Sequence, residues 1–306
     1  MENLFSISDY PINLFLKNLL QDKTTKKNII WATDVEGFKP TDQITVMSLQ
    51  GQHSFELQPR VMKNLQAQAA RTKSKAEVMT PSWICNKMNS HCDEEWFGYK
   101  DVFNKEDGHS WIVKEGKIEF PKDKSWKDYV NSTRLEITCG EGPFLMSRYD
   151  TTTGETIPVS RRIGILDRKL RVVNENTSEL KSWAECAVKA FQSCYGYEWQ
   201  GDNLLIARCN ALLTFVEYYR DRWEEDPPKE LLKKIVNIIV WNLWQMDGLT
   251  GCVPMKKAAP EHEQIVLDLF GEENEKDKEE RAEPCRIYDW KANKSVLYNS
   301  LKEGRE

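Results

Sequence analysis

The stretch of this 306-residue chain with the clearest chemical potential runs over residues 136–145, Glu-Ile-Thr-Cys-Gly-Glu-Gly-Pro-Phe-Leu. The pattern predicts a strand over residues 135–139, a tight turn at Gly140 and Gly142, and a helix that opens at residues 144–146. Glycine lets a ligand approach the backbone closely, and the start of a helix offers free amide groups. The stretch therefore indicates a ligand-binding turn, although a Gly-x-Gly alone is also typical of an ordinary tight turn.

The residues of this stretch resemble the cofactor motif of amino-group DNA methyltransferases, Asp-Pro-Ala-Cys-Gly-Ser-Gly-x-Phe-Leu. Glu136 stands where the motif has Asp, whereas Ile137, Thr138 and Glu141 depart from the motif, and Glu141 adds a carboxylate near the turn. The positions that match outright are Cys139, Gly140, Gly142, Phe144 and Leu145. The resemblance implies S-adenosylmethionine as cofactor and a Rossmann-like methyltransferase fold.

Two further segments resemble motifs of the same family, in the family's order. Thr80 and Pro81, in VMTPSWI, resemble the Thr-Pro motif of adenine methyltransferases, whose backbone contacts the methionine end of the cofactor. Glu198 and Trp199, in YGYEW, close the second expected strand. An acidic residue there accepts hydrogen bonds from ribose hydroxyls, as in dinucleotide-binding folds, which makes Glu198 the candidate.

Asp247, in NLWQMDG, follows the third expected strand. In the family an acidic residue at this place faces the cofactor adenine, but an Asp before Gly is equally typical of a turn. Both interpretations stay open. The similarity extends over the whole chain and is closest to the methylation subunits of restriction-modification systems, on phrases such as KNIIWATD, EEWFGYKDVFN and IYDWKANKS.

The catalytic tetrapeptide of the family, (Asn/Asp/Ser)-Pro-Pro-aromatic, is absent from the sequence. In the family it receives an adenine flipped out of the duplex, accepts hydrogen bonds from its amino group and stacks an aromatic ring on it. The segment Asp-Pro-Pro-Lys at 226–229 lacks the aromatic residue and precedes the third expected strand, so we expect a loop before a helix. We therefore assign no catalytic residue.

Three explanations of this absence compete. A second polypeptide brings the catalytic motif and target recognition, or the chain is a truncated or degenerate remnant, or it is a non-catalytic DNA- or subunit-binding regulatory module. We favour the first two because the cofactor motifs are intact and because half a parallel sheet leaves an edge for a partner to cover. A nucleotide-dependent oxidoreductase is disfavoured, since the third glycine of the dinucleotide fingerprint is missing.

Alternating strands and helices predict an α/β fold: a partial, mostly parallel Rossmann-like sheet with flanking helices, preceded by an N-terminal α+β extension. The expected division is an extension over 1–75, a Thr-Pro helix and aromatic-rich hairpin region over 76–133, a cofactor-binding core over 134–256, and an acidic linker with a last strand over 257–306. The expected helices are 1–20, 61–70, 82–88 with Thr80 as cap, 182–191, 203–220, 230–235 and 261–269. The expected strands are 28–32, 43–49, 135–139, 193–199, 237–244 and 286–290, with hairpin and loop material over 93–130 and a charged linker over 272–283.

Composition excludes some function classes. The chain has 40% hydrophobic and 30% charged residues, its net charge is −5, and it contains no run near the roughly 20 apolar residues of a membrane span. The N-terminus lacks the basic start of a signal peptide, so we expect a cytoplasmic protein. The eight cysteines are scattered, and Cys85, His91 and Cys92 fit no common zinc spacing, so we expect no metal.

Charge is unevenly distributed along the chain. Residues 60–75 and 161–171 are basic, and residues 261–283 are acidic. Such runs are usually solvated faces, but the basic ones are also candidates for phosphate contacts with DNA, with Arg161, Arg162, Arg168 and Arg171 as the residues to neutralise.

Overall fold

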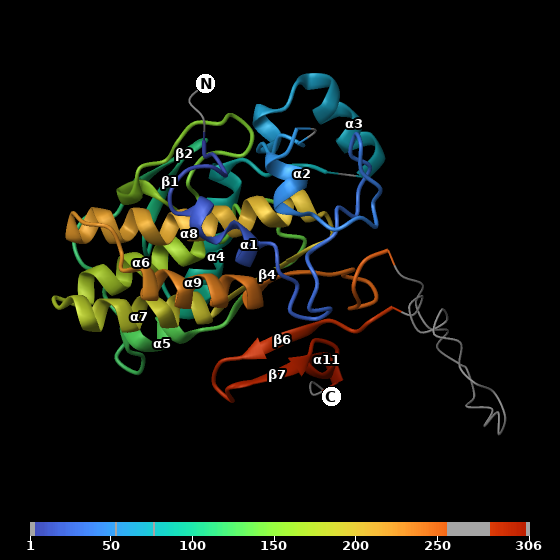
Figure 1. Ribbon diagram of the computed structural model, residues 1–306. Helices are drawn as coiled ribbons and strands as arrows, with labels where there is room; N and C mark the ends of the chain where they lie inside the picture. Colours follow the sequence, from blue (N-terminus) through green and yellow to red (C-terminus); the bar gives the residue numbers. More distant parts are fainter. Residues whose placement is uncertain (1–3, 53, 76, 256–281, 304–306) are drawn as a thin grey trace.

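The computed structural model describes residues 4–52, 54–75, 77–255 and 282–303 (Figure 1). The helices are α1 Ile12–Leu19, α2 Val46–Gln50, α3 Leu65–Lys75, α4 Ser82–Phe97, α5 Trp126–Asn131, α6 Ile165–Asn176, α7 Leu180–Gln192, α8 Gly201–Trp223, α9 Lys229–Asn242 and α11 Ser300–Glu303, with 3-10 turns η1 Arg60–Met62 and η2 Val159–Arg161. The strands are β1 Asn104–Asp107, β2 Ser110–Val113, β3 Arg134–Glu136, β4 Cys194–Glu198, β5 Leu243–Gln245, β6 Arg286–Asp289 and β7 Lys294–Leu297.

A three-stranded parallel sheet, in the order β3-β4-β5, lies at the centre of the fold. The chain passes from β3 to β4 through α6 and α7, and from β4 to β5 through α8 and α9. Cys194 and Leu243 pack with these helices in the main core, whereas Tyr197 and Trp244 pack with Ile287 of the β6–β7 hairpin. The expected α/β class is therefore observed, with helices on one face of a small parallel sheet and a hairpin against the other.

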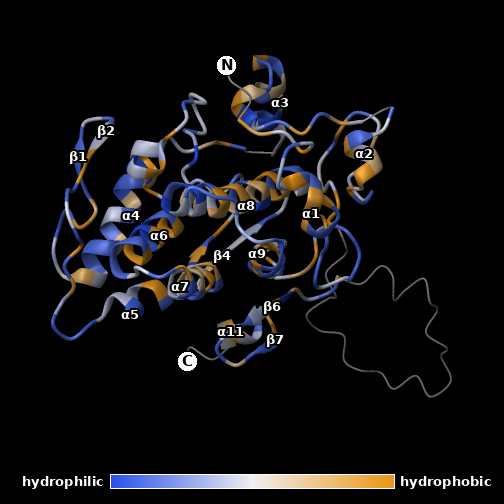
Figure 2. Cartoon of the chain, turned by 60° about the vertical axis from the view of Figure 1, so that its left-hand side comes forward, coloured by the Kyte–Doolittle hydropathy of each residue, from blue (hydrophilic) through white to orange (hydrophobic). Residues whose placement is uncertain are grey.

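Helix α8 crosses the middle of the molecule and is buried along most of its length (Figure 1). The positions expected in the core have no exposed surface: Leu204, Leu205, Ala207, Leu212 and Phe215. A helix that is apolar on several faces is stable only when other elements surround it. Figure 2 shows the hydrophobic residues of α7, α8 and α9 gathered at the centre.

The N-terminal segment belongs to the same core. Ile12 and Phe15 of α1, together with Trp31, are buried in one cluster with Phe215. The segment 1–75 therefore does not form a separate core of its own.

The two edges of the central sheet differ. At β5, the side chain of Gln245 exchanges hydrogen bonds with the backbone of Ile30: its Oε1 accepts from the Ile30 amide at 2.9 Å, and its Nε2 donates to the Ile30 carbonyl at 2.8 Å. Across the described ranges, no strand pairs with the outer edge of β3. Leu135 and Ile137 at that edge are 44% and 62% exposed.

Three expected strands are wrong or shorter than expected. Residues 28–32 form isolated bridges and no ladder: Asn28 pairs with Gln21, and Ile30 pairs with Gln43. Residues 43–49 lead into α2, whose N-terminus is capped by Thr45 and Ser48 in a capping box. The apolar run 237–244 continues α9 as far as Asn242 and leaves only β5 as strand. A short, fully buried apolar run has no period that separates strand from helix, and here packing against α8 and the sheet favours helix.

Two expectations about helix starts are also wrong. Residues 144–146 form turns, and the next helix, α6, begins at Ile165. Thr80 does not cap α4: Pro81 occupies the N-cap position without a side-chain bond, and the Ser82 amide donates to Asp150 Oδ2 at 2.6 Å. The Asp150 carboxylate, distant in sequence, thus accepts the hydrogen bond from a free amide at the start of α4, a role that was expected of Thr80.

Several other elements differ in extent from those expected: the strand expected over 135–139 is β3 (134–136), and the helices expected over 1–20 and 82–88 are α1 (12–19) and α4 (82–97). Helices α5 and α6 lie where no helix was expected. The others are close to those observed. Helix α7, strand β4, helix α8 and the hairpins β1–β2 and β6–β7 lie where the pattern predicts them. The expected helix 261–269 and residues 272–281 of the expected linker lie outside the described residues. In the part of the chain that the structure describes, no helix has the length and apolar character needed to cross a bilayer.

A buried arginine on α8 ties α1 to the end of α9. The Arg208 guanidinium donates to the carbonyls of Leu19, Gln21 and Leu243, at 2.5, 2.9 and 2.7 Å. These carbonyls lie at or beside the C-terminal ends of α1 and α9, where helix dipoles favour a cation. Burial lowers the pKa of Arg208 to about 10, so the guanidinium stays charged at neutral pH.

We predict that Arg208→Met lowers the free energy of unfolding by about 3 kcal/mol or more, because it leaves several buried carbonyls without a donor. Urea unfolding followed by circular dichroism measures the change. Arg220→Met on the same helix is the control: Arg220 is half-exposed and pairs with an exposed Asp226, so the loss should stay below about 1 kcal/mol. Equal losses in the two variants would contradict this role of Arg208.

Candidate functional site

A cavity of about 580 Å³ lies at the carboxyl ends of β3 and β4. Its volume is in the range of small-molecule and cofactor sites. Most of the residues expected to bind the cofactor line it: Thr80, Glu136, Cys139, Gly140, Phe144, Glu198 and Trp199. Three segments that lie far apart in the sequence therefore meet at one site.

Glu136, the last residue of β3, holds the glycine turn in place. Its carboxylate accepts hydrogen bonds from the amides of Phe144, at 3.3 Å, and Leu145, at 3.0 Å. Burial raises the pKa of Glu136 to about 8, the two amides oppose this, and the nearby Glu198 adds to it. The strand end and the far side of the turn are thus joined by one buried carboxyl group.

Glu198, at the end of β4, joins the second strand to the same turn. Its Oε2 accepts from the Gly140 amide at 2.9 Å, and its Oε1 accepts from the Gln200 amide at 3.0 Å. Burial raises its pKa, which these two amides oppose. A carboxylate has about four acceptor sites, so Glu198 retains acceptor capacity for hydroxyl groups of a ligand.

The turn depends on left-handed backbone conformations. Gly140 and Gly142 have φ of +52° and +80°, and Thr138 has φ of +47°. A β-branched residue such as threonine rarely adopts this region, and such strain is concentrated at functional turns. A Cβ on Gly142 would lie 2.6 Å from the Cε of Met146, so this glycine serves the packing behind the turn and does not line the cavity.

An ion-pair network closes one side of the cavity. Arg71 of α3 contacts Glu77 and Asp202, both at 2.7 Å, and Lys63 contacts Asp202 at 3.2 Å. Asn203 of α8 donates to Glu77 at 3.1 Å. Burial opposes the ionisation of Asp202, but Lys63 and Arg71 outweigh it and hold its pKa below the usual value. The network fixes α3 against the start of α8, beside Glu198.

The lining defines what the cavity offers a ligand. Glu77, Glu136 and Glu198 supply carboxyl groups, and among the described residues that line it none is lysine, arginine or histidine. Burial, with Glu136 and Glu198 adding, raises the pKa of the Cys139 thiol well above its usual value, so the thiol is a poor nucleophile. The cavity is therefore suited to a ligand that carries hydroxyl groups or positive charge, and it provides no nucleophile of its own.

Besides Gly142, two candidate residues and one suspected carboxylate lie outside the cavity. Pro81 precedes α4, and Asp247 accepts from the Leu249 amide and the Thr250 hydroxyl, both at 2.9 Å, within its own turn. Of the two interpretations of Asp247, the turn is the one observed. Glu141 is 1% exposed and accepts from Tyr149 and the Arg60 amide, both at 2.6 Å, so it points away from the cavity.

Eight lining residues were not among the candidates: Glu77, Val78, Met79, Ile137, Thr138, Pro143, Gln200 and Asn203. Each lies within a recognised motif or one to five residues from it, so proximity to Thr80, Gly140 or Glu198 was the available signal. The structure also holds no group of three His, Cys, Asp or Glu side chains that could bind a metal ion, in the residues it describes.

Most arginines of the two basic stretches are paired with carboxylates and are not free to contact phosphate, whereas Arg161 is exposed and forms no salt bridge among the described residues. Arg162 pairs with Glu217, Arg168 with Asp93, and Arg171 with Glu175. Arg168 is 1% exposed. Arg60 and Arg71, in the first stretch, pair with Glu77. Arg162 and Arg168 are reached by carboxylates distant in sequence, a pairing that a local charge run does not reveal, whereas Arg171 pairs within α6.

We predict that Glu136→Gln changes the pH dependence of stability. The folded-state pKa of Glu136 is raised, so wild-type protein binds more protons when folded than unfolded between about pH 4.5 and 8, and this contribution to stability is lost as pH rises. The free energy of unfolding of the variant relative to wild type should therefore rise with pH over that window, by up to about 1.4 kcal/mol per unit. Urea unfolding at several pH values measures it, with exposed Glu115→Gln as control. A constant difference between pH 5 and 8 would contradict it.

Comparison of the chain with models of protein families, with curated proteins and with solved structures finds no match. The function proposed below therefore rests on the residues of the chain and on the geometry of this cavity.

Proposed function

We propose that this chain is the S-adenosylmethionine-binding component of a DNA adenine methyltransferase of a restriction-modification system, and that a second polypeptide supplies the catalytic tetrapeptide and target recognition. One observation carries the proposal. The Thr-Pro segment, the glycine turn and the acidic end of the second strand, which were singled out from sequence alone, contribute Thr80, Gly140 and Glu198 to a single cavity.

The order of the strands supports the proposal. Ligands of open parallel sheets bind outside the carboxyl ends of the strands, and the cavity lies at the carboxyl ends of β3 and β4. Glu198 ends β4 and faces the glycine turn, which is the position from which an acidic residue accepts ribose hydroxyls.

The chemistry of the cavity fits the cofactor. Its volume and carboxyl groups suit a molecule that carries hydroxyls, an ammonium group and a sulfonium, and Trp199 and Phe144 offer apolar surface for a base. When bound, S-adenosylmethionine supplies the methyl group. The residues of this chain would bind and orient it: Glu198 by accepting hydroxyl protons and Glu136 by keeping the turn that faces it in shape.

The lack of a nucleophile in the cavity is compatible with direct methyl transfer to a base held by another protein. The unpaired outer edge of β3, with Leu135 and Ile137 exposed, offers a place where such a partner could extend the sheet. Neither feature assigns a partner by itself, and both fit a divided enzyme better than a self-sufficient one.

We predict that Glu198→Gln weakens the binding of S-adenosylmethionine by about 10- to 100-fold, because hydrogen bonds to a charged group contribute about 1.5–3 kcal/mol each. Isothermal titration calorimetry measures the affinity. Asp247→Asn is the matched control, since Asp247 lies outside the cavity and asparagine can keep its turn, and this variant should bind as wild type does. Absence of wild-type binding at millimolar cofactor, or equal weakening by both substitutions, would contradict the proposal.

We further predict that the chain alone transfers no methyl group to duplex DNA, since the tetrapeptide is absent from its sequence. Transfer of a radiolabelled methyl group should appear when a polypeptide carrying (Asn/Asp/Ser)-Pro-Pro-aromatic, from the same operon, is added. Cofactor binding without transfer in the reconstituted pair would favour the alternative, a regulatory module without chemistry.

A further inference from the structure

Two cavities adjoin on the face formed by α1, α9, the loop between α1 and residue 28, and the β6–β7 hairpin. One, of about 260 Å³, lies between α1 and α9, and the other, of about 820 Å³, lies between the loop and the hairpin. Both are lined by Gln21 and Lys23, so they adjoin at these residues, and together they are here called the lysine groove.

The lysine groove is strongly cationic although the chain carries a net charge of −5. Two carboxylates line it, Asp22 and Glu283. Asp22 is turned into its own loop, where it accepts from the Thr25 amide at 2.9 Å and hydroxyl at 2.6 Å. The seven cationic residues of the lining are Lys17, Lys23, Lys26, Lys27, Lys229, Lys233 and Arg286.

Most of these cations have no acidic partner. Within the described ranges, only Lys233 forms a salt bridge, with Glu230 at 2.6 Å, and Arg286 donates to Ser295 instead. This contrasts with the arginines of the two basic stretches, which are paired with carboxylates inside the fold. Uncompensated positive charge on one face is the feature expected of a surface that binds a polyanion.

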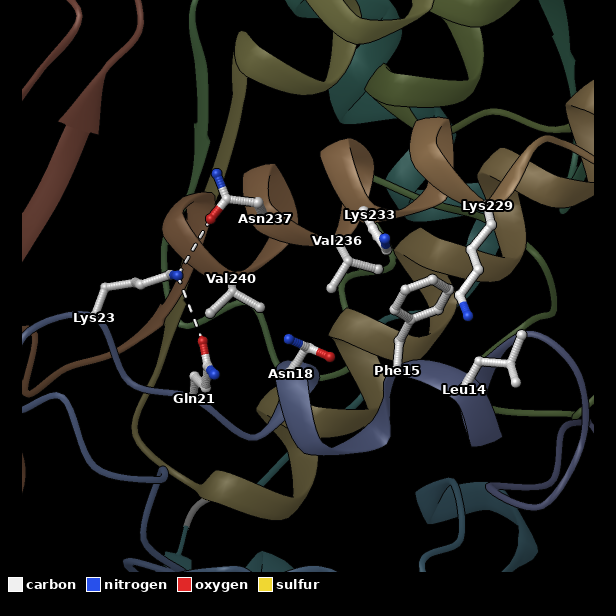
Figure 3. A pocket seen from close by; sticks show the side chains of 10 residues that line it. All are labelled: Leu14, Phe15, Asn18, Gln21, Lys23, Lys229, Lys233, Val236, Asn237 and Val240. Atoms are coloured by element: carbon white, nitrogen blue, oxygen red, sulfur yellow. Dashed lines mark hydrogen bonds between the residues drawn. The ribbon is translucent and has the colours of Figure 1, made fainter.

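Lys23 lines both cavities, and Figure 3 shows it beside Gln21 and Asn237 at the first of them. Its Nζ donates to Asn237 Oδ1 at 3.2 Å and lies 5.7 Å from the centre of the Trp241 ring. Partial burial lowers its pKa, and the positive charge of Arg208 lowers it further. The charge of an anion placed beside Lys23 would oppose both effects and favour the charged ammonium.

We propose that the lysine groove binds the phosphate backbone of double-stranded DNA and is the DNA-contacting surface of this chain. The proposal rests on the function proposed above, from which the choice of DNA follows. Lysines provide the phosphate contacts that dominate non-specific affinity, and the amide side chains of Asn18, Gln21 and Asn237 offer further donors to phosphate oxygens.

The lining favours a duplex over other polyanions. Single-stranded nucleic acids bind where aromatic rings are open to stacking, but in this groove Phe15 is buried and Trp241 already packs against Tyr288, with ring centres 5.2 Å apart. A membrane surface would require a row of exposed apolar side chains to insert, and Leu14 is the one large hydrophobic residue of the described lining that is exposed.

The test replaces four unpaired groove lysines by glutamine, in a variant with Lys17→Gln, Lys26→Gln, Lys27→Gln and Lys229→Gln. The matched control changes four exposed lysines outside the groove, with Lys105→Gln, Lys117→Gln, Lys122→Gln and Lys181→Gln. Both variants have the same net charge, so a difference between them reports position and not total charge. Fluorescence anisotropy measures the affinity of each full-length protein for a labelled duplex between about 50 and 200 mM salt.

We expect the groove variant to bind at least about tenfold more weakly than wild type at the lowest salt, with a salt dependence flatter by about 3 in the log–log slope, while the control binds as wild type does. Thermal unfolding and cofactor titration of the same proteins separate the causes. Retained folding and cofactor binding with lost DNA affinity support the groove. The groove proposal is overturned if the two variants bind DNA equally well. It is also overturned if the wild-type protein binds only single-stranded RNA or phosphatidylserine vesicles. Neither result affects the proposed cofactor binding. Loss of cofactor binding by wild type would overturn the proposed function instead.

Discussion

One hydrogen bond, from the Gly140 amide to the Glu198 carboxylate, joins the turn after β3 to the end of β4. Strand pairing alone brings the two strand ends side by side, but this bond fixes how the turn faces the second strand. Glu136 makes the matching connection to the far side of the turn. Because both carboxyl groups are buried beside each other, their charges are costly, and the cavity between them is predisposed toward ligands that donate hydrogen bonds or bring positive charge.

The rest of the architecture supports this junction. Arg208 anchors α8 to α1 and to the end of α9, and the ion pairs of Arg71 hold α3 against the start of α8. Stability and the proposed DNA contact thus use charged residues differently: most arginines of the two basic stretches are paired with carboxylates inside the fold, whereas most groove lysines form no salt bridge within the described residues. The cavity is neutral to acidic, and the lysine groove, on another part of the fold, is cationic. Such a separation is what the proposed binding of both a small cofactor and a polyanion requires.

Local sequence predicted the strongest elements and about half of the residues that line the cavity. Glycine spacing, a terminal Glu and the period of α8 are local signals, so the turn, β4 and the buried face of α8 could be foreseen. What failed depends on partners distant in sequence. Residues 236–242 are helical because they pack against α8, and the amide of Ser82 is satisfied by Asp150, not by Thr80. Likewise, Arg162 and Arg168 pair with Glu217 and Asp93, which no local charge count identifies.

The most direct measurement of the central claim is a crystal structure of the chain with S-adenosylhomocysteine, the product form of the proposed cofactor. The account predicts the nucleoside in the cavity between the glycine turn and β4, with ribose hydroxyls within hydrogen-bond distance of Glu198 and the amino-acid end beside the backbone of Thr80. A ligand bound elsewhere, or a cavity closed by the Glu198 side chain at saturating ligand, would contradict it.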